Sequence, residues 1–276
     1  MSATHLPVIG ACLTVGAAEQ LQTWLFDKDR DLEIQDFVFP ETLESGGHDI
    51  VDRYAGLLDG FRGRIGIHGP FFGLDLAAID PDIQAVVRKR LLQGLDACEA
   101  LGATQMVVHS PFTVWHHLNF GNSPQMKQRI VETFQDNLAP VVSRAEDIGC
   151  TLVIENIEEA DPLERVRLAD AFGSDRVRVS IDTGHANCAH GSFGAPPVDQ
   201  FVKAAGGRLE HVHLQDTDGQ ADCHWLPGNG TVNWPAFFEA LRDHCDQPRL
   251  VIEVLGQYQA EIPACVARLE AQGLAQ

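Results

Sequence analysis

Short apolar stretches alternate with amphipathic stretches along the whole chain. Each apolar stretch is a few residues long and rich in Val, Ile and Leu, as is typical of a buried β-strand. The amphipathic stretches repeat their apolar residues with the period of an α-helix. We predict strands over residues 8–13, 32–37, 64–68, 105–109, 151–155, 177–182, 209–213 and 250–254. We predict helices over residues 17–26, 50–58, 81–101, 123–148, 162–172, 198–205, 234–245 and 258–269.

The clearest helix start is Asp80-Pro81, because Asp is a favoured N-cap and proline is favoured at the first helical position. Strand and helix alternate throughout, which implies parallel strands joined by right-handed crossovers. Together with a length of 276 residues, the pattern predicts an α/β fold, a single (β/α)8 TIM barrel. No linker or composition shift divides the chain, so we expect residues 1–276 to form a single domain.

The composition narrows the choice of partners and location. A net charge of −19 argues against a general electrostatic grip on nucleic acid, which needs clustered Lys and Arg. No apolar run is long enough for a transmembrane helix, and the N-terminus shows no signal-peptide pattern. The 7 cysteines form no C-x-x-C pair, which indicates reduced thiols rather than disulfides or a cysteine–zinc site. We therefore expect a cytoplasmic protein with no membrane partner.

The strand ends carry the candidate chemistry. Side chains along a strand alternate between its two faces, so the residues that face the helices identify those that face the barrel interior. In residues 151–155, Leu152 and Ile154 face outward, and Glu155 at the strand end therefore faces inward. The same parity puts a polar side chain inward at the end of strands three to eight. These side chains are His68, His109, Glu155, Asp182, His213 and Glu253. Barrel enzymes keep their active sites at this C-terminal end of the strands.

Imidazoles and carboxylates gathered at one barrel mouth need compensation, because unpaired buried charges cost several kcal/mol. A divalent metal would supply it, and nitrogen and oxygen donors suit Zn, Mn, Co, Fe or Mg. His185 follows Asp182 by three residues, and Asp222-x-His224 lies in the loop after strand seven. With these added, the candidate ligands could hold one to three ions per chain. Two or three neighbouring ions would bind an oxyanion or produce hydroxide near neutral pH.

Several candidates have a second interpretation that the sequence leaves open. Asp182 is also a favoured helix N-cap. The strand-end carboxylates and His213 could form ordinary ion pairs, while Asp222 and His224 could belong to a solvated loop. Three histidines could contact a substrate instead of a metal ion: His68, His109 and His185.

Other polar residues near the mouth carry weaker signals. His211 faces inward one layer deeper than the strand end, and we expect it to be a hydrogen-bonded core histidine. Glu33 and Gln35 face inward on strand two, where a polar barrel layer explains them equally well. We expect residues 113–122 to form a loop that covers the mouth, with Trp115 as a candidate substrate contact.

The motifs at these strand ends resemble those of the xylose isomerase-like barrel superfamily. That superfamily groups sugar isomerases and epimerases with the endonuclease IV family, also called AP endonuclease family 2. The resemblance runs over nearly the whole chain from Ile65 onward and is specific for the superfamily rather than for one activity. Its carriers are Ile67-His68-Gly69-Pro70-Phe71, Val108-His109-Ser110-Pro111, Val153-Ile154-Glu155-Asn156, Ile181-Asp182-Thr183-Gly184-His185-Ala186-Asn187, His213-Leu214-Gln215-Asp216, Asp222-Cys223-His224, Pro227-Gly228-Asn229-Gly230-Thr231-Val232-Asn233-Trp234 and Val251-Ile252-Glu253.

The two branches of the superfamily imply different metal sites. The isomerase and epimerase branch implies one divalent ion, with Glu155 and Glu253 also moving the proton beside the carbonyl. Its ligands would be Glu155, Asp182, His213 and Glu253. The endonuclease branch implies three zinc ions. The first would use His68, His109 and Glu155, the second the four ligands just named, and the third His185, Asp222 and His224.

The sequence differs from the motifs of both branches at several positions, and these differences limit the function that we expect. The first strand lacks the Gly-Ala-His start of endonuclease IV, and the loop after Phe37 is acidic where a DNA-binding loop would be basic. Gly219 stands where ketose 3-epimerases carry an arginine, and the glutamate–lysine signature of true xylose isomerases is missing. We expect a metal-dependent isomerase or epimerase acting on a small sugar, polyol or sugar phosphate, in a chain that could form a homo-oligomer. The alternatives are a multinuclear-zinc phosphodiesterase acting on abasic DNA and a non-catalytic binding barrel.

Overall fold

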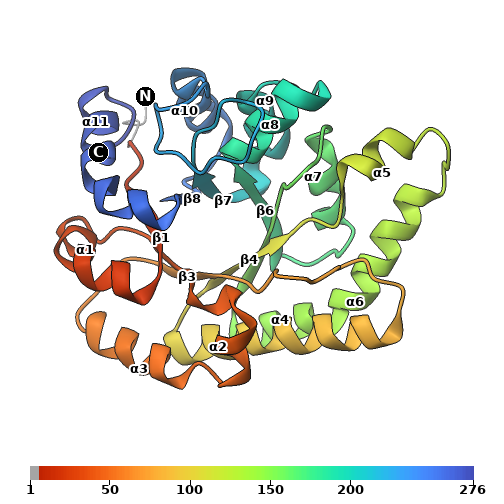
Figure 1. The fold of residues 1–276 in the computed structure, drawn as a ribbon, viewed down its shortest axis with the longest axis horizontal. Coiled ribbons are helices and arrows are strands. Elements are labelled where there is room, and N and C mark those ends of the chain that lie inside the picture. Colours follow the sequence, from red (N-terminus) through yellow and green to blue (C-terminus); the bar gives the residue numbers. More distant parts are fainter. Residues whose placement is uncertain (1–5) are drawn as a thin grey trace.

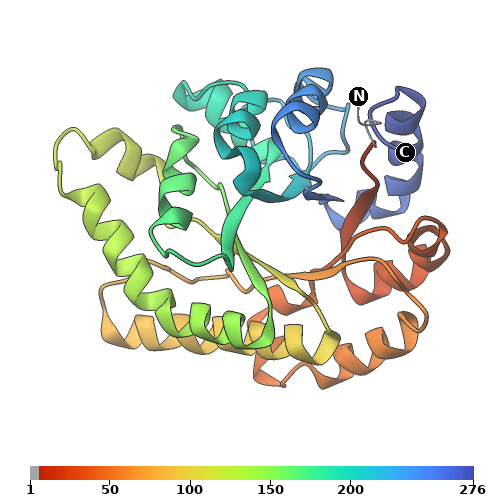
Figure 2. The same ribbon diagram turned by 180° about the vertical axis from the view of Figure 1, so that it is seen from behind.

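The computed structural model describes residues 6–276 as a closed barrel of eight parallel strands, in the order of the chain, with the helices packed around it (Figures 1 and 2). This confirms the predicted (β/α)8 TIM barrel. The strands are β1 (Ile9–Leu13), β2 (Leu32–Ile34), β3 (Ile65–His68), β4 (Gln105–His109), β5 (Thr151–Glu155), β6 (Val177–Asp182), β7 (Leu209–Leu214) and β8 (Arg249–Ile252).

Helices follow the strands on the outside of the barrel. They are α1 (Val15–Asp27), α2 (Pro40–Glu44), α3 (His48–Leu57), α4 (Pro81–Leu101), α5 (Val114–Asn119), α6 (Met126–Ile148), α7 (Leu163–Asp170), α8 (Thr183–Phe193), α9 (Val198–Ala205), α10 (Trp234–His244) and α11 (Ile262–Ala271). Three short 3-10 turns are η1 (Asp36–Val38), η2 (Gly206–Arg208) and η3 (Gly256–Glu261). Among residues 6–276, no helix combines the length and the apolar character that crossing a membrane requires.

The side chains of a strand alternate between the apolar layer under the helices and the interior of the barrel. Leu152 and Ile154 of β5 belong to the apolar layer between strands and helices, whereas Val153 and Glu155 do not. This alternation is the predicted parity. The register of the parallel ladder aligns neighbouring strand ends, with His109 opposite Glu155 and Asp182 opposite His213. The parity and the register together bring side chains from distant parts of the sequence to one end of the barrel.

Strand two is shorter than predicted. The ladder ends where the Gln35 amide donates to the Leu13 carbonyl at 2.9 Å. The next residue, Asp36, turns the chain into η1, because its buried carboxylate accepts hydrogen bonds from the Val15 amide at 2.8 Å and the Tyr54 hydroxyl at 3.2 Å. A side chain that captures backbone and hydroxyl donors in this way competes with strand continuation.

Three helices were not predicted. No helix was predicted between residues 182 and 198, but α8 starts directly at the strand end, capped by Asp182. Its two glycines, Gly184 and Gly191, weaken the helical signal in the sequence. The expected loop over residues 113–122 contains α5, whose N-cap is Thr113. The short helix α2 begins with Pro40 at its first position.

Several boundaries also differ from the predicted ones. Helix α6 begins at Met126 instead of residue 123, and the last predicted helix is divided into η3 and α11. Strand β8 ends at Ile252, so Glu253 lies one residue beyond it. The Glu253 amide still donates to the Leu214 carbonyl at 3.3 Å, which keeps its side chain in register with the other strand ends.

Candidate metal centre

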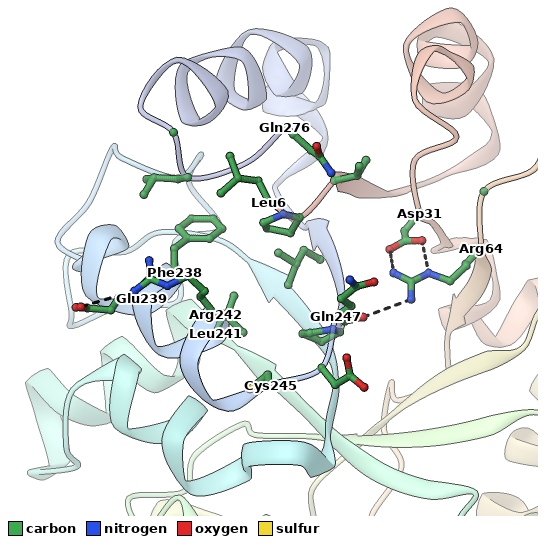
Figure 3. A pocket seen from close by; sticks show the side chains of 18 of the residues that line it. Leu6, Asp31, Arg64, Phe238, Glu239, Leu241, Arg242, Cys245, Gln247 and Gln276 are labelled. Carbon is green, nitrogen blue, oxygen red and sulfur yellow. Dashed lines mark hydrogen bonds and ion pairs between the residues drawn. The ribbon is translucent and has the colours of Figure 1, made fainter. Parts of the chain in front are cut away.

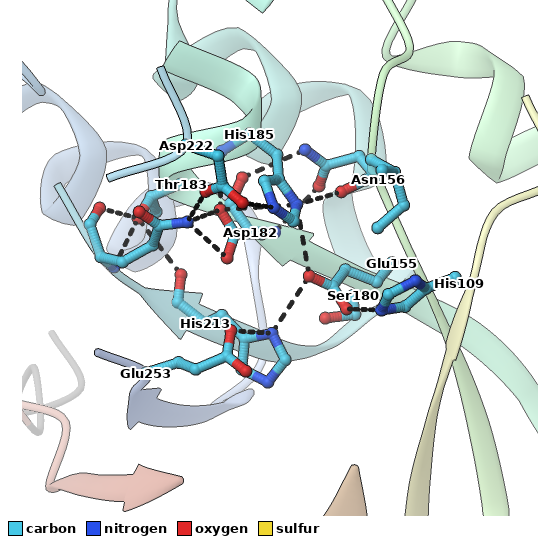
Figure 4. A network of polar contacts seen from close by, with 12 residues as sticks. His109, Glu155, Asn156, Ser180, Asp182, Thr183, His185, His213, Asp222 and Glu253 are labelled. Carbon is cyan, nitrogen blue, oxygen red and sulfur yellow. Dashed lines mark hydrogen bonds and ion pairs between the residues drawn. The ribbon is translucent and has the colours of Figure 1, made fainter. Parts of the chain in front are cut away.

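Four donor side chains from four consecutive strand ends meet at the mouth of the barrel (Figure 4). Glu155, Asp182, His213 and Glu253 each offer one ligand atom, and these atoms all lie within 4.8 Å of one another. All four side chains are buried. The grouping agrees with the inward parity predicted for β5 to β8.

His213 lies at the centre of this group. Its Nδ1 atom is 3.2 Å from Glu155 Oε1 and 3.4 Å from Glu253 Oε2, and its Nε2 atom is 2.8 Å from Glu33 Oε1. Burial opposes the charged imidazolium, but the surrounding carboxylates outweigh it and raise the pKa of His213 well above its usual range. The same contact with His213 overcomes burial and holds the pKa of Glu155 well below its usual range. Without a metal ion, a protonated His213 therefore balances part of the carboxylate charge.

Asp182 is both a helix cap and a member of the donor group. Its Oδ1 atom accepts a hydrogen bond from the His185 amide at 2.7 Å, which caps α8. It also accepts a hydrogen bond from the Gln215 side-chain amide at 3.1 Å. Burial, assisted by the charge of Glu155, raises the pKa of Asp182 to about 6. The N-cap interpretation is therefore confirmed. The same carboxylate also lies within the donor group, and its role as a metal ligand stays a prediction.

A second donor group adjoins the first and shares Glu155 with it. Ligand atoms of His68, His109 and Glu155 lie within 4.8 Å of one another. The Nε2 atoms of His68 and His109 are 3.9 and 3.6 Å from Glu155 Oε2. That oxygen is buried and has no hydrogen-bond partner among the described residues. Burial lowers the pKa of His109 to about 3, so its imidazole is neutral and can act as a ligand.

A third donor group consists of His185 on α8 with Asp222 and His224 in the loop after β7, and it adjoins the first group. His185 Nε2 and His224 Nε2 are 3.3 and 3.2 Å from the same oxygen of Asp222. Although burial opposes ionisation, these two imidazoles lower the pKa of Asp222 strongly. Gln215 joins this group to the first one, because its side-chain amide donates to Asp222 at 2.9 Å as well as to Asp182.

The space for Gln215 depends on a glycine. A Cβ atom on Gly184 would lie only 2.2 Å from the side-chain carbon of Gln215. The loop after β7 is fixed separately by Asp216, which lies fully buried. Its carboxylate accepts hydrogen bonds from the Gly228 amide at 2.8 Å, the Val232 amide at 3.1 Å and the Trp234 indole at 2.9 Å. These contacts hold the loop that carries the third group.

Three of the candidate histidines have one ring nitrogen in contact with an acceptor that is not itself a candidate ligand. His68 Nδ1 is 2.9 Å from the Gly69 carbonyl, and His185 Nδ1 is 2.9 Å from the Asn156 carbonyl. A carbonyl oxygen only accepts, so in the neutral form of either ring the proton lies on Nδ1 and the lone pair on Nε2. That Nε2 atom faces Glu155 and Glu253 in His68, and Asp222 in His185. His213 is held in the opposite sense, through Nε2 and Glu33. Such outer contacts orient metal-ligating histidines.

Sequence reasoning missed or left undecided three supporting residues. Glu33 was consistent with a generic polar layer, but it contacts the candidate ligand His213. Asn156 and Gln215 stood within the motifs but had no assigned role. Asn156 accepts a hydrogen bond from the Asp182 amide at 2.9 Å and donates one to the Asp182 carbonyl at 3.1 Å. In the sequence, the only indication of a role for Asn156 was its position directly after the end of a strand.

The other predicted residues lie outside these groups. His211 is buried, and its Nδ1 atom is 2.9 Å from the Ser180 hydroxyl, as expected for a hydrogen-bonded core histidine. Trp115 lies on α5 with 61% of its surface exposed and packs against the ring of His116. Its role as a substrate contact stays a prediction.

A large cavity lies elsewhere in the molecule (Figure 3). Its volume is about 620 Å³, and it lies between the start of β1, α10 and the C-terminal residues. An ion pair between Arg64 and Asp31, with a shortest distance of 2.6 Å, forms part of its wall. None of the candidate ligands lines this cavity, so it is separate from the barrel mouth.

The donor set at the mouth fits divalent cations. Several carboxylates and imidazoles converge at the mouth. Among the ion pairs of the described residues, none joins a lysine or arginine to Glu155, Asp182 or Glu253. Buried carboxylates of this density cost free energy unless they are paired or bind a metal. The orphaned Glu155 Oε2 atom is a further acceptor that a cation would satisfy. Chemically, such a centre can polarise a carbonyl or lower the pKa of bound water.

Comparison with known proteins agrees with the fold. A family model described as "Xylose isomerase-like TIM barrel" matches residues 30–272. The uncharacterized protein MJ1311 of Methanocaldococcus jannaschii is 25% identical over 200 residues, which cover 68% of this chain and 63% of that protein. Fructoselysine 3-epimerase of Escherichia coli O157:H7 is 27% identical over 142 residues, which cover 48% of each chain. The chain thus spans about half to two thirds of the length of these relatives.

Among solved structures, the TTHB071 protein of Thermus thermophilus, from a crystal soaked with ZnCl2, is similar over most of its length. The TM-score is 0.72 at 26% identity, and the match covers 95% of this chain and 98% of that one.

The charge of His224 predicts a pH-dependent stability of the metal-free protein. Burial opposes that charge, but the hydrogen bond with Asp222 and the nearby Glu253 and Asp182 raise the pKa of His224 from 6.5 to about 9. A pKa that is higher in the folded state stabilises the fold fully below about pH 6.5, and this contribution is lost as the pH rises through about 9.

We therefore expect the stability difference between wild type and His224→Gln, measured by urea unfolding with a chelator present, to shrink by about 1–3 kcal/mol over that pH range. A difference that stays constant with pH would contradict the assigned ion pair.

Proposed function

Because the chain belongs to the xylose isomerase-like TIM barrel family, we propose that it is a divalent-metal-dependent sugar isomerase or epimerase. Its substrate would be a small sugar, polyol or sugar phosphate, and its reaction a proton transfer next to a carbonyl group. The fructoselysine 3-epimerase among its relatives supports the reaction class. The single observation that carries the proposal is the convergence of Glu155, Asp182, His213 and Glu253 within 4.8 Å at the barrel mouth.

These four residues would hold the ion. The donors are nitrogen and oxygen atoms, so Zn, Mn, Co, Fe and Mg are all compatible. The relative whose crystal was soaked with ZnCl2 makes zinc the first ion to test. When bound, a divalent ion would polarise the carbonyl and the neighbouring hydroxyl of the sugar, which acidifies the C–H bond between them.

Glu155 and Glu253 would be the acid and base that move the proton. Their carboxylates approach the same Nδ1 atom of His213 from two strands, at 3.2 and 3.4 Å. A sugar carbon held between two carboxylates can lose a proton to one and regain it from the other. Although burial opposes it, the contact with His213 keeps the pKa of Glu155 below its usual range, so this carboxylate is ionised at neutral pH.

The surroundings of the pair would bind and orient the sugar. His68 and His109 face the orphaned Glu155 oxygen and would contact sugar hydroxyls, as would His185. Trp115, exposed on α5, would cover the sugar from the side of the loop after β4. We also propose a cytoplasmic location, which the free state of all 7 cysteines supports. We further propose that the chain can form a homo-oligomer, which is compatible with its fold family.

Solvent exchange tests the proposed reaction. A panel of aldoses, ketoses and sugar phosphates is incubated in D2O with the zinc- or manganese-loaded protein, and deuterium at the carbon next to the carbonyl is measured by NMR. We expect exchange with at least one sugar, and a loss of about 10²- to 10⁴-fold in its rate in Glu155→Gln and in Glu253→Gln. The matched control is Glu132→Gln, a glutamate on the outer helix α6 that should exchange normally. No exchange with any sugar by the metal-loaded protein would contradict the proposal.

A second candidate function is a multinuclear-zinc phosphodiesterase acting on abasic DNA. The observation that favours it is the third donor group, because His185, Asp222 and His224 are not needed for a single-ion site. Together the three groups could hold up to three ions, which would position a phosphate and activate a hydroxide. The net charge of −19 argues against it, since DNA binding needs a basic surface.

Abasic DNA separates the two candidates. If the protein is the proposed isomerase, a duplex with a single abasic site should remain intact in the presence of zinc at low salt, for wild type and for Asp222→Asn alike. Nicking by wild type that is lost in both Asp222→Asn and Glu155→Gln would instead establish the phosphodiesterase. The same preparation must show sugar exchange, so that an inactive sample is not mistaken for a negative result.

A further inference from the structure

We propose that Glu33 is a positioning residue, whose carboxylate holds His213 so that its Nδ1 atom, and not Nε2, is the metal ligand. The inference rests on the metal centre of the proposed function. It concerns a residue that is not among the candidate ligands inferred from the strand ends. Glu33 lies on β2, on the opposite side of His213 from the candidate metal site.

The contact between Glu33 and His213 is short and fully enclosed. Glu33 Oε1 lies 2.8 Å from His213 Nε2, and the two side chains are 3% and 0% exposed. An ionised carboxylate only accepts hydrogen bonds, so Nε2 of His213 must carry the proton. Both oxygens of Glu33 face imidazole nitrogens, at 2.8 Å each, which is the environment of an ionised carboxylate.

This hydrogen bond decides which nitrogen can bind a metal. With the proton on Nε2, the neutral ring has its lone pair on Nδ1. Nδ1 is the atom that faces Glu155 and Glu253, at 3.2 and 3.4 Å. The tautomer imposed by Glu33 is therefore the one in which the lone pair points toward the other donors. His68 and His185 are held by neutral backbone carbonyls, whereas His213 is held by a charged carboxylate, which also makes its ring a stronger ligand.

A second buried histidine supports Glu33 from the other side. His211 Nε2 is 2.8 Å from Glu33 Oε2, off the line of an ideal hydrogen bond. His211 Nδ1 is 2.9 Å from the Ser180 hydroxyl, which can donate to it. The two imidazoles thus occupy both oxygens of Glu33. A glutamine at this position has the same shape, but it has one carbonyl oxygen and no charge, so it cannot reproduce both contacts.

Glu33 could instead bind the metal directly, together with Cys12. Ligand atoms of Cys12, Glu33 and His213 also lie within 4.8 Å of one another. The buried Cys12 thiol donates a long hydrogen bond of 4.0 Å to Glu253 Oε1, which is a contact of the protonated thiol and not of the thiolate that a metal requires. A cobalt-substituted protein distinguishes the two arrangements, because a thiolate ligand produces an intense charge-transfer band and an outer-shell role for Glu33 does not.

The test measures zinc affinity by competition with a chromophoric chelator, without any turnover. We expect Glu33→Gln to bind the same number of ions as wild type, with an affinity about 10- to 100-fold lower. Asp36→Asn is the matched control, since Asp36 is another buried carboxylate near β2 that contacts Val15 and Tyr54 rather than a candidate ligand. It should lose stability but keep its zinc affinity. Unchanged affinity in Glu33→Gln, an equal loss in the control, or a thiolate band with cobalt would overturn the proposal.

A second measurement needs no variant and decides the matter if Glu33→Gln fails to fold. Long-range ¹⁵N–¹H NMR of zinc-loaded wild type identifies the protonated ring nitrogen of His213. We expect the proton on Nε2 and the metal on Nδ1, and the reverse assignment would overturn the proposal. Zinc binding as described but no sugar exchange would contradict the proposed reaction and leave the role of Glu33 supported. A wild-type protein that binds no divalent ion would contradict both.

Discussion

Buried carboxylate charge at the mouth of the barrel is the constraint on which the rest of this structure depends. Glu155, Asp182 and Glu253 converge there with Glu33 one layer deeper, and all of them are largely removed from water. Carboxylates in such a place are stable only if protons, imidazolium groups or metal ions compensate them. In the metal-free state the compensation comes from the raised pKa of His213 and from the pKa of about 6 that burial gives to Asp182. A divalent cation would displace these protons, which makes metal binding dependent on pH.

The barrel supplies this arrangement through its most regular features. Parallel strands of matched register end at the same level, and side-chain alternation turns every second residue inward. The supporting contacts are equally local. Asp182 caps α8 while it faces the other donors, and the carbonyls of Gly69 and Asn156 hold His68 and His185 by their outer nitrogens. The same few residues therefore build the fold and orient the site.

Features that depend on residues close together in the sequence were predictable, and features that depend on contacts between distant residues were not. The strand ends were predictable, because parity is a local property and the apolar partners of Glu155 and Glu253 stand next to them in the sequence. Helix α8 was not, since its glycines hide the helical period and its start depends on a cap that could equally be a ligand. The role of Glu33 was beyond reach, because its partner His213 is 180 residues away and only the closure of the barrel brings the two together.

The presence of a metal ion is the claim that all the proposed chemistry shares. It is tested most directly by elemental analysis of protein purified without added metal, compared with a double variant in which Asp182→Asn and Glu253→Gln remove two of the four donors. We expect at least one equivalent of a divalent transition metal per wild-type chain and a strong loss in the double variant. One equivalent is the count that a single-ion isomerase needs. A wild-type chain that contains no divalent ion, and retains none after incubation with zinc and dialysis, would contradict the account.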